Sequence, residues 1–196
     1  MRKGKIVKDK VILVDGDGVI LDWVYAFGQW MKRHGFEEVD DSVYDIHIRY
    51  NIDKKYAKML VRMFNESATI RKIPPLRDAI KYIQKLHKDH GYIFHAVTSL
   101  SNDYYAQHLR TKNLIELFGP TVFEKYTYLD TGADKDEALE EYRDTGCYWI
   151  EDKPENAHVG LKAGLNPYIM AHDFNADEKV IPRVQNWKEL YEIITG

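Results

Sequence analysis

Short apolar runs alternate with amphipathic stretches along much of the chain. The apolar runs predict one strand that begins at Lys10 and others over 92–97, 122–129, 147–150 and 167–170. The amphipathic stretches between and after them predict helices over 76–87, 103–118, 134–142, 155–163 and 187–194. This alternation is typical of a doubly wound parallel sheet, so we predict an α/β fold.

The segment 20–74 interrupts the alternation with two predicted helices, over 22–31 and 54–65, joined by a polar connection. Apolar side chains recur at helical spacing in both, as Trp23, Phe27, Trp30 and Met31 and then as Tyr56, Met59, Leu60, Met63 and Phe64. The double proline Pro74-Pro75 prevents a helix from crossing it and opens the next one. We predict a helical cap over 20–74, inserted into a core of 1–19 and 75–196 and lying over the end of the first strand.

The first strand ends in the sequence Asp15-Gly16-Asp17-Gly18. In parallel sheets ligands bind beyond the carboxyl ends of the strands, and glycine lets a backbone approach a phosphate closely. Two neighbouring carboxylates would repel a phosphate unless a hard divalent cation binds them, which predicts Mg²⁺. With the metal present, one carboxylate can form an aspartyl-phosphate while the other transfers the proton. The alternative is an Asp-Gly turn without chemistry.

Polar groups also follow the second strand and precede a later helix. The hydroxyls of Thr98 and Ser99 can donate to phosphate oxygens, and Thr98 is the better placed because it falls at the strand end. A helix-capping role before Asp103 is the alternative. Lys135 lies where a helix begins, a position that the helix dipole disfavours for a cation, so an anion such as phosphate could compensate it. The alternative for Lys135 is an ordinary solvated lysine.

The fourth strand ends in Glu151-Asp152, and Asn156 follows one helical turn later. Because this strand end can face Asp15, we predict Asp152 as a further metal ligand. Asn156 could hold a metal-bound water or position Asp152, and Glu151 could share either role. Helix capping by Asp152 is the alternative.

Composition narrows the classes of function. The 196 residues carry a formal net charge of -3 with both signs mixed, so we expect neither a nucleic-acid polymer nor a membrane as partner. The single cysteine, Cys147, lies in an apolar run and predicts a buried core residue. The basic stretch 1–10 lacks an apolar region and no segment is long enough to span a membrane, so we expect a soluble, cytoplasmic protein. A homodimer is compatible with the sequence.

Together these four segments resemble the four motifs of the haloacid dehalogenase superfamily of phosphotransferases. The matches are Asp15-Gly-Asp-Gly-Val19, Thr98, Lys135 and the acidic cluster of Glu151, Asp152 and Asn156. The resemblance implies that Asp15 is the nucleophile and an Mg²⁺ ligand. It implies that Asp17 is the general acid and base and binds Mg²⁺ through its main-chain carbonyl, and that Asp152 is the third ligand. Thr98 and Lys135 would stabilise the transferred phosphoryl group.

Within this superfamily the chain is most similar to the 5'(3')-deoxyribonucleotidases and other small 5'-nucleotidases. The likeness lies in the helical insert, in Ile150-Glu-Asp-Lys-Pro154 and in Phe118-Gly-Pro120, although Glu151 stands where those enzymes usually carry Asp. It implies hydrolysis of (deoxy)nucleoside monophosphates, with Trp23 stacked on the base. Aromatic side chains at helical spacing are also typical of a core, so a packing role for Trp23 stays open.

Two other functions remain compatible with the sequence. One is a phosphosugar phosphatase or mutase of the same fold, distinguished by a polar rather than an aromatic cap pocket. The other is a non-catalytic phosphate-binding or interaction module, against which the complete set of acidic, hydroxyl and lysine residues argues. A dinucleotide-binding domain is excluded because Asp15-Gly-Asp-Gly does not match Gly-x-Gly-x-x-Gly.

Overall fold

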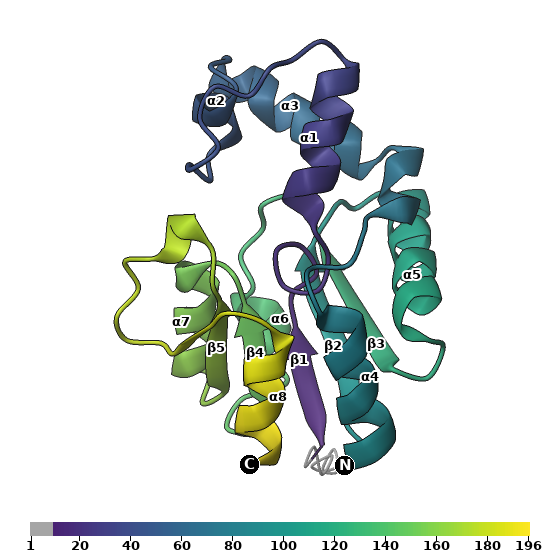
Figure 1. Ribbon diagram of the computed structural model, residues 1–196, viewed down its shortest axis with the longest axis vertical. Helices are drawn as coiled ribbons and strands as arrows, with labels where there is room; N and C mark the ends of the chain where they lie inside the picture. The colour runs from purple at the N-terminus through teal and green to yellow at the C-terminus, as the bar shows by residue number, and fades with distance from the viewer. Residues whose placement is uncertain (1–9) are drawn as a thin grey trace.

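Six parallel strands form one sheet in the order β3-β2-β1-β4-β5-β6 (Figure 1). The computed structural model describes residues 10–196, so most of the basic stretch 1–10 lies outside the described residues. The strands are β1 (Val11–Val14), β2 (Ile93–Ser99), β3 (Phe123–Leu129), β4 (Tyr148–Glu151), β5 (Asn166–Met170) and β6 (Arg183–Val184). The predicted doubly wound α/β fold is confirmed.

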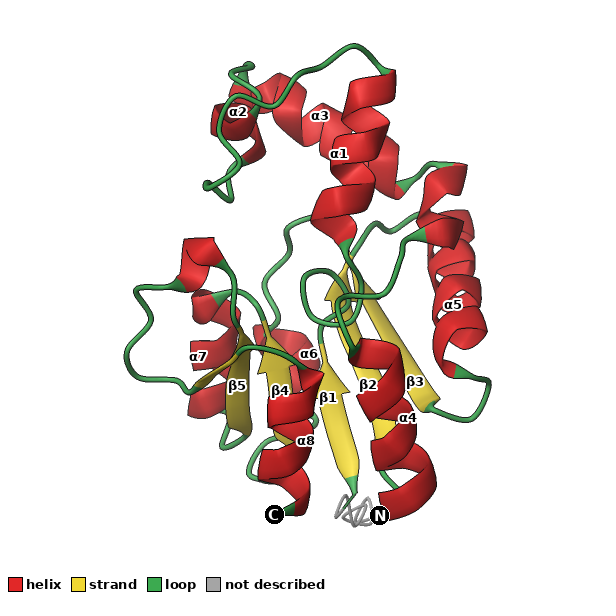
Figure 2. Ribbon diagram, viewed as in Figure 1, coloured by secondary structure: helices red, strands yellow, loops and turns green. Residues whose placement is uncertain are grey.

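Helices cover both faces of this sheet and form a separate group above its carboxyl edge (Figure 2). The helices are α1 (Trp23–Arg33), α2 (Ile46–Arg49), α3 (Lys54–Asn65), α4 (Ala79–His90), α5 (Tyr104–Phe118), α6 (Asp136–Glu140), α7 (Pro154–Lys162) and α8 (Trp187–Thr195), with 3₁₀ turns at Ala68–Lys72 and Asp173–Asn175. None of the helices within 10–196 has the length and apolar character that crossing a membrane would require.

Strand β1 consists of apolar residues alone because both of its faces are buried. Successive side chains of a strand point to opposite faces, and both faces of this sheet are covered. Ile12 and Val14 pack in the cluster that includes α4, α5 and α8, whereas Val11 and Leu13 pack in the cluster on the other face with α6. The strand therefore delivers the residue that follows it, Asp15, to the centre of the carboxyl edge.

The element boundaries differ from the sequence prediction at a few places. Helix α4 begins at Ala79 rather than at residue 76, because Arg77 has a φ of 45° and the helix starts only after the cap residue Asp78. Strand β6 and helix α2 were not predicted, since two and four residues carry too little periodicity. Cys147 is buried, as expected.

The helices between β1 and α4 lie above the carboxyl edge of the sheet (Figure 1). Helix α3 coincides with its predicted range, and its Leu60 and Phe64 are buried. Tyr56, Met59 and Met63 are exposed, so the predicted apolar stripe is wider than the face that packs. Helix α3 packs mainly against α1, α2 and the 3₁₀ turn at Ala68–Lys72, and its C-terminal end also reaches the core through Arg62 with Asp130 and Asn65 with the Leu100 carbonyl. The division into a core and a cap at residues 20 and 74 is our proposal.

Helix α7 lies very close to β4 at Gly160. A β-carbon at this position would lie 2.3 Å from the Trp149 ring, within the fully buried core. Gly28 in α1 has room, because the nearest atom to its β-carbon would be the Tyr50 hydroxyl at 3.6 Å. Glycine at residue 160 thus allows α7 to pack against the strand that ends in Glu151.

We predict opposite effects of the same substitution at these two helical glycines. Gly160→Ala should lower the free energy of unfolding by about 1–3 kcal/mol because the core is overpacked. Gly28→Ala should raise it by about 0.5–1 kcal/mol because alanine restricts the unfolded chain and favours helix. Chemical denaturation measures both values, and equal effects would contradict the close contact at Gly160.

Candidate active site

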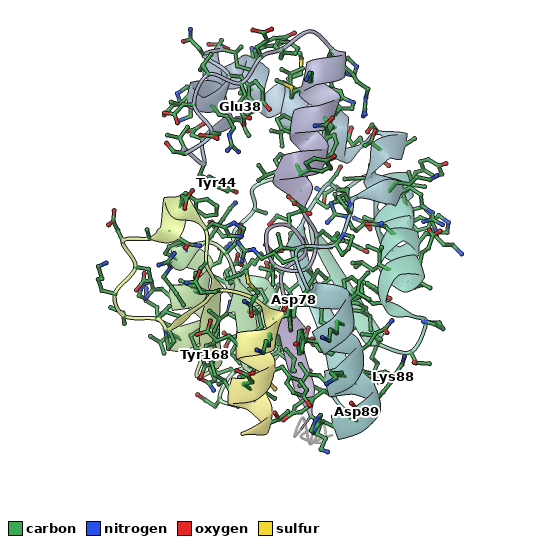
Figure 3. The ribbon with its side chains drawn as sticks, viewed as in Figure 1. Glu38, Tyr44, Asp78, Lys88, Asp89 and Tyr168 are labelled. Atoms are coloured by element: carbon green, nitrogen blue, oxygen red, sulfur yellow. The ribbon has the colours of Figure 1, made fainter. Side chains whose placement is uncertain are left out.

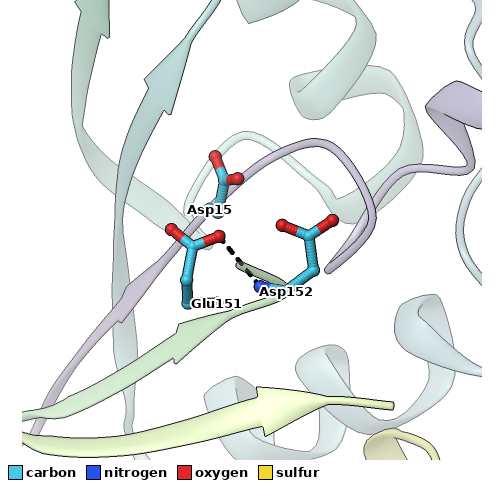
Figure 4. A group of neighbouring side chains, drawn as sticks. All are labelled: Asp15, Glu151 and Asp152. Atoms are coloured by element: carbon cyan, nitrogen blue, oxygen red, sulfur yellow. Dashed lines mark hydrogen bonds between the residues drawn. The ribbon is translucent and has the colours of Figure 1, made fainter. Parts of the chain in front are cut away.

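Three segments of the chain bring a lysine and three carboxylates together at the carboxyl edge of the sheet. Lys135 Nζ lies 2.9 Å from Asp15 Oδ1 and 2.8 Å from Glu151 Oε2. All three side chains are buried, and so is Asp152. Asp15 follows β1, Glu151 ends β4 and Lys135 is the cap residue of α6, so the parallel sheet positions each of them. Figure 4 shows the three carboxylates facing one another.

Glu151 is the most strongly bound of these carboxylates. Its Oε1 accepts hydrogen bonds from the backbone N–H groups of Asp152 and Lys153, while Oε2 accepts from Lys135. Burial raises the pKa of Glu151, but the Lys135 ammonium and these donors outweigh it and lower that pKa to about 2. Glu151 is therefore the fixed anion that holds Lys135 in place.

Asp15 and Asp152 are compensated less completely. Burial raises the pKa of Asp15 to about 6, against the effect of Lys135 and with support from the charges of Glu151 and Asp17. Burial also raises the pKa of Asp152 well above its ordinary value, and the charge of Glu151 adds to this. Three carboxylates thus share one directly bonded ammonium, that of Lys135, and the nearby Lys153 charge offsets Asp152 only in part, so full ionisation leaves the group with excess negative charge.

A divalent cation fits this excess charge. One oxygen from each of Asp15, Glu151 and Asp152 lies within 4.8 Å of the others. Asp152 Oδ1 is buried without a hydrogen-bond partner, although buried carboxylates are normally satisfied. Because Glu151 already accepts three hydrogen bonds, Asp15 and Asp152 are the better ligands. Oxygen donors of this kind suit Mg²⁺.

The side chain of Asp17 lies outside this group. Its Oδ1 accepts a 2.7 Å hydrogen bond from Nη1 of Arg110, a fully buried residue of α5. The placement is compatible with the role that the resemblance implies for Asp17, in which its main-chain carbonyl would bind the metal and its carboxylate would transfer the proton. Sequence reasoning missed Arg110, yet it stands at a buried helical position between Ala106 and Leu114, where a charge is unusual.

Thr98 and Ser99 have different surroundings. The Thr98 hydroxyl is fully buried and has no partner, and it lies 2.9 Å from the point that a β-carbon on Gly16 would occupy. It is therefore an available donor beside the loop that follows β1. The Ser99 hydroxyl donates to the backbone carbonyl of Ala133 at 3.0 Å, which ties the end of β2 to the loop that carries Lys135.

Gly18 allows the loop after β1 to lie against Asp152. Its φ is 76°, and a β-carbon there would lie 2.2 Å from Asp152 Oδ2. On the other side of the loop, the Gly18 carbonyl accepts a hydrogen bond from His172 Nε2 at 2.6 Å. Asn175 donates to the backbone carbonyl of Asp152 at 2.8 Å. The 3₁₀ turn after β5 thus holds both acidic loops, and Asn175 positions the backbone of Asp152, a role for which the sequence had suggested Asn156.

Trp23 lies in the aromatic interior of the cap. Its ring stacks on Phe27 with centroids 4.6 Å apart and meets Phe64 edge-on, and its indole N–H donates to Asn65 Oδ1 at 2.9 Å. The ring remains partly exposed. Its proposed stacking on a nucleobase therefore stays a prediction, alongside a clear packing role.

Tyr44 brings the cap to the acidic loops, and sequence reasoning missed it. Its ring centroid lies 4.7 Å from that of Phe174, and Lys153 Nζ lies 4.9 Å from its centroid. Figure 3 shows Tyr44 at the lower end of the cap loop, facing the core. Tyr44 as a whole is 45% exposed, and desolvation of its hydroxyl raises the pKa of Tyr44 to about 12, an effect that the Lys153 charge opposes and the Asp152 charge supports. Its place in an irregular loop gave no sequence pattern to detect.

Sequence similarity connects the chain to a phage protein. No protein-family model matches the chain. In sequence it is 27% identical over 191 residues to an uncharacterized 32.4 kDa protein of Enterobacteria phage T4, from the Gp30-rIII intergenic region. The match covers 91% of this chain and 67% of the phage protein.

Several solved structures share the architecture over nearly their whole length. A haloacid dehalogenase-like hydrolase from Streptococcus pneumoniae matches with a TM-score of 0.64 at 14% identity, covering 94% of this chain and 98% of that one. The chain has the haloacid dehalogenase fold. The HAD-hydrolase YfnB from Bacillus subtilis, bound to magnesium, matches with a TM-score of 0.61 at 18% identity, and the match covers 95% of this chain and 99% of YfnB. CbbY from Rhodobacter sphaeroides, in complex with phosphate, matches with a TM-score of 0.58 at 16% identity, and the match covers 92% of this chain and 96% of CbbY.

In this haloacid dehalogenase fold, metal binding and pH should be coupled. The pKa of Asp15 is about 6 in the folded chain and 3.8 ordinarily. Between these values the folded state binds more protons than the unfolded state, so the Asp15 contribution makes metal-free stability fall as pH rises, up to about pH 6. Mg²⁺ needs the deprotonated carboxylates, so it should raise the melting temperature more at about pH 7.5 than at about pH 5.

Differential scanning calorimetry with Mg²⁺ and with EDTA measures this dependence. Asp15→Asn is the matched control, because it removes one of the uncompensated charges while keeping the shape of the side chain. It should be more stable than the wild type without metal and should gain less from Mg²⁺. An Mg²⁺ shift that is the same at both pH values, or the same in both proteins, would contradict the assignment of the acidic group to a cation.

Proposed function

We propose that the protein is an Mg²⁺-dependent phosphomonoesterase that works through an aspartyl-phosphate on Asp15. The observation that carries the proposal is the buried Lys135 between Asp15 and Glu151, together with two buried polar atoms that have no partner, Asp152 Oδ1 in the acidic group and Thr98 Oγ1 beside Gly16. A phosphate with a bound divalent cation would satisfy both, because its oxygens accept from the hydroxyl and the cation binds the carboxylate.

The contacts of Asp15 indicate which oxygen reacts. Both donors to its carboxylate, the backbone N–H of Gly16 at 2.7 Å and Lys135 Nζ at 2.9 Å, reach Oδ1. This arrangement leaves Oδ2 to attack phosphorus. A bound Mg²⁺, held by Asp15, Asp152 and the main-chain carbonyl of Asp17, would supply positive charge for the transferred phosphoryl oxygens.

Lys135, Thr98 and Asp17 carry out the remaining steps, which are charge stabilisation and proton transfer. Lys135 and Thr98 donate to phosphoryl oxygens as negative charge develops on them, and both are fixed in place before reaction. Asp17 gives a proton to the leaving oxygen as the first ester bond breaks. It then takes a proton from the water that attacks phosphorus and frees Asp15. Tyr44 and the cap loop would limit the access of other water.

We propose (deoxy)nucleoside monophosphates as substrates. The support is the resemblance of the motifs to small 5'-nucleotidases and the aromatic character of the region where the cap meets the core. Trp23, Tyr44 and Phe174 all offer ring faces within the cap or at its junction with the acidic loops. Stacking of a base on such a ring contributes about 1–3 kcal/mol.

A phosphosugar phosphatase or mutase is the second candidate. Lys153 and the Tyr44 hydroxyl lie beside the aromatic rings, and both can bond to sugar hydroxyls or to a second phosphate. The fold is shared with CbbY, a mutant of which has also been crystallised with xylulose-(1,5)-bisphosphate. A non-catalytic phosphate-binding module would need only Lys135 and Thr98 as donors. It would not explain why Asp15 and Asp152 are buried with their charges only partly compensated.

Phosphate release separates these candidates. We expect Mg²⁺-dependent release that is concentrated on nucleoside monophosphates within a panel of deoxynucleotides, ribonucleotides and sugar phosphates. EDTA and Asp15→Asn should each abolish it, because the cation and the nucleophile are then absent. Release concentrated on sugar phosphates would support the second candidate. Release from any substrate that persists in Asp15→Asn would contradict the nucleophile assignment.

Two leucine substitutions test how a base would be bound. If Tyr44 stacks on it, Tyr44→Leu should raise KM for a nucleoside monophosphate about tenfold and leave that for glycerol phosphate nearly unchanged. Trp23→Leu is the matched variant. If Trp23 only packs in the cap, this substitution should change KM for the nucleoside monophosphate and for glycerol phosphate by the same factor. A selective loss in Trp23→Leu alone would assign the stacking to Trp23, and no selective loss in either would exclude base stacking on these rings.

A further inference from the structure

Arg110 is a charged side chain buried completely behind the loop that follows β1. It is 0% exposed, and Nη1 lies 2.7 Å from Asp17 Oδ1, whereas the Asp17 side chain itself is partly exposed. Burial of a guanidinium costs several kcal/mol unless close partners compensate it. The burial of Arg110 against one oxygen of a partly exposed carboxylate is therefore unfavourable for folding, which suggests a functional role for this side chain.

Packing alone does not account for this arginine. Its Nε and Nη2 are buried without hydrogen-bond partners, so the side chain is not held by a full set of structural bonds. Nη1 also lies 3.0 Å from the point that a β-carbon on Gly16 would occupy, on the side where the Thr98 hydroxyl lies 2.9 Å from the same point. Arg110 thus lies beneath the loop, next to both Asp17 and the proposed phosphate donor.

We propose that Arg110 is a positioning residue that holds Asp17 Oδ1 so that Oδ2 faces the leaving group of the substrate. The inference rests on the proposed phosphatase function and adds a residue to its proton transfer. The guanidinium is planar and is carried by the long helix α5, which packs on the sheet, so it fixes the carboxylate better than a flexible ammonium would.

Asp17 Oδ2 carries the proton in both steps of the reaction. As Asp15 Oδ2 bonds to phosphorus, the bond from phosphorus to the leaving oxygen breaks and its electron pair stays on that oxygen. The proton on Asp17 Oδ2 moves to the leaving oxygen, which departs as an alcohol, and Asp17 remains as a carboxylate. Water then attacks phosphorus, gives a proton to Asp17, and releases Asp15 and inorganic phosphate.

The dependence of kcat/KM on the leaving group tests this role. An alkyl phosphate needs a proton on its poor leaving group, whereas p-nitrophenyl phosphate expels a stable anion without one. Arg110→Met keeps the length and burial of the side chain and removes its charge. We expect it to lower kcat/KM for the alkyl phosphate about 100-fold and that for p-nitrophenyl phosphate less than about threefold, as loss of general acid catalysis does.

The controls are Asp17→Asn and the double variant. If Arg110 acts through Asp17, Asp17→Asn shows the same leaving-group pattern and the double variant is no worse than Asp17→Asn alone. Equal losses of Arg110→Met on both substrates, or losses that add in the double variant, would overturn the inference. If Arg110→Met does not fold, Arg110→Lys is judged by the same criteria. No phosphate release by the wild type would instead refute the proposed function.

Discussion

The ammonium of Lys135 lies between Asp15 and Glu151 with all three side chains buried, and the other features of the site depend on this arrangement. Burial makes each charge unfavourable, so the lysine is needed wherever the two carboxylates are brought together. Lys135 cannot balance Asp152 as well, and the Lys153 charge offsets Asp152 only in part, because the pKa of Asp152 stays well above its ordinary value. The remaining charge gives the site an affinity for a divalent cation and, through that cation, for the phosphate of a substrate.

The sheet creates this arrangement because its parallel strands end at one edge. Strands β1 and β4 are neighbours, so Asp15 and Glu151 meet although they are far apart in the sequence. The apolar residues of both strands place the carboxylates in a covered position, and the close packing of Gly160 on Trp149 fixes the end of β4. The cap adds aromatic side chains above the same edge, and Tyr44 brings one of them to the acidic loops.

Residues that follow a strand pattern could be predicted from the sequence, and residues that depend on tertiary packing could not. Asp15, Thr98 and Glu151 lie at or next to the carboxyl ends of strands, where periodicity and topology together indicate that they share one edge of the sheet. Arg110 lies within a helix, and only the packing of α5 against the loop makes it a partner of Asp17. Tyr44 lies in an irregular loop, and the exposure of Met59 depends on what covers α3. None of these three follows from local pattern.

The covalent intermediate on Asp15 is the most direct measure of the proposed chemistry. Substrate labelled in its phosphate, mixed with enzyme and Mg²⁺ and quenched in acid, should leave label on the peptide that contains Asp15. Borohydride should convert that residue to homoserine, which mass spectrometry identifies. We predict label on Asp15 during turnover and its loss when water completes the reaction. Turnover without label on Asp15, or label on another residue, would contradict the assignment of Asp15 as the nucleophile.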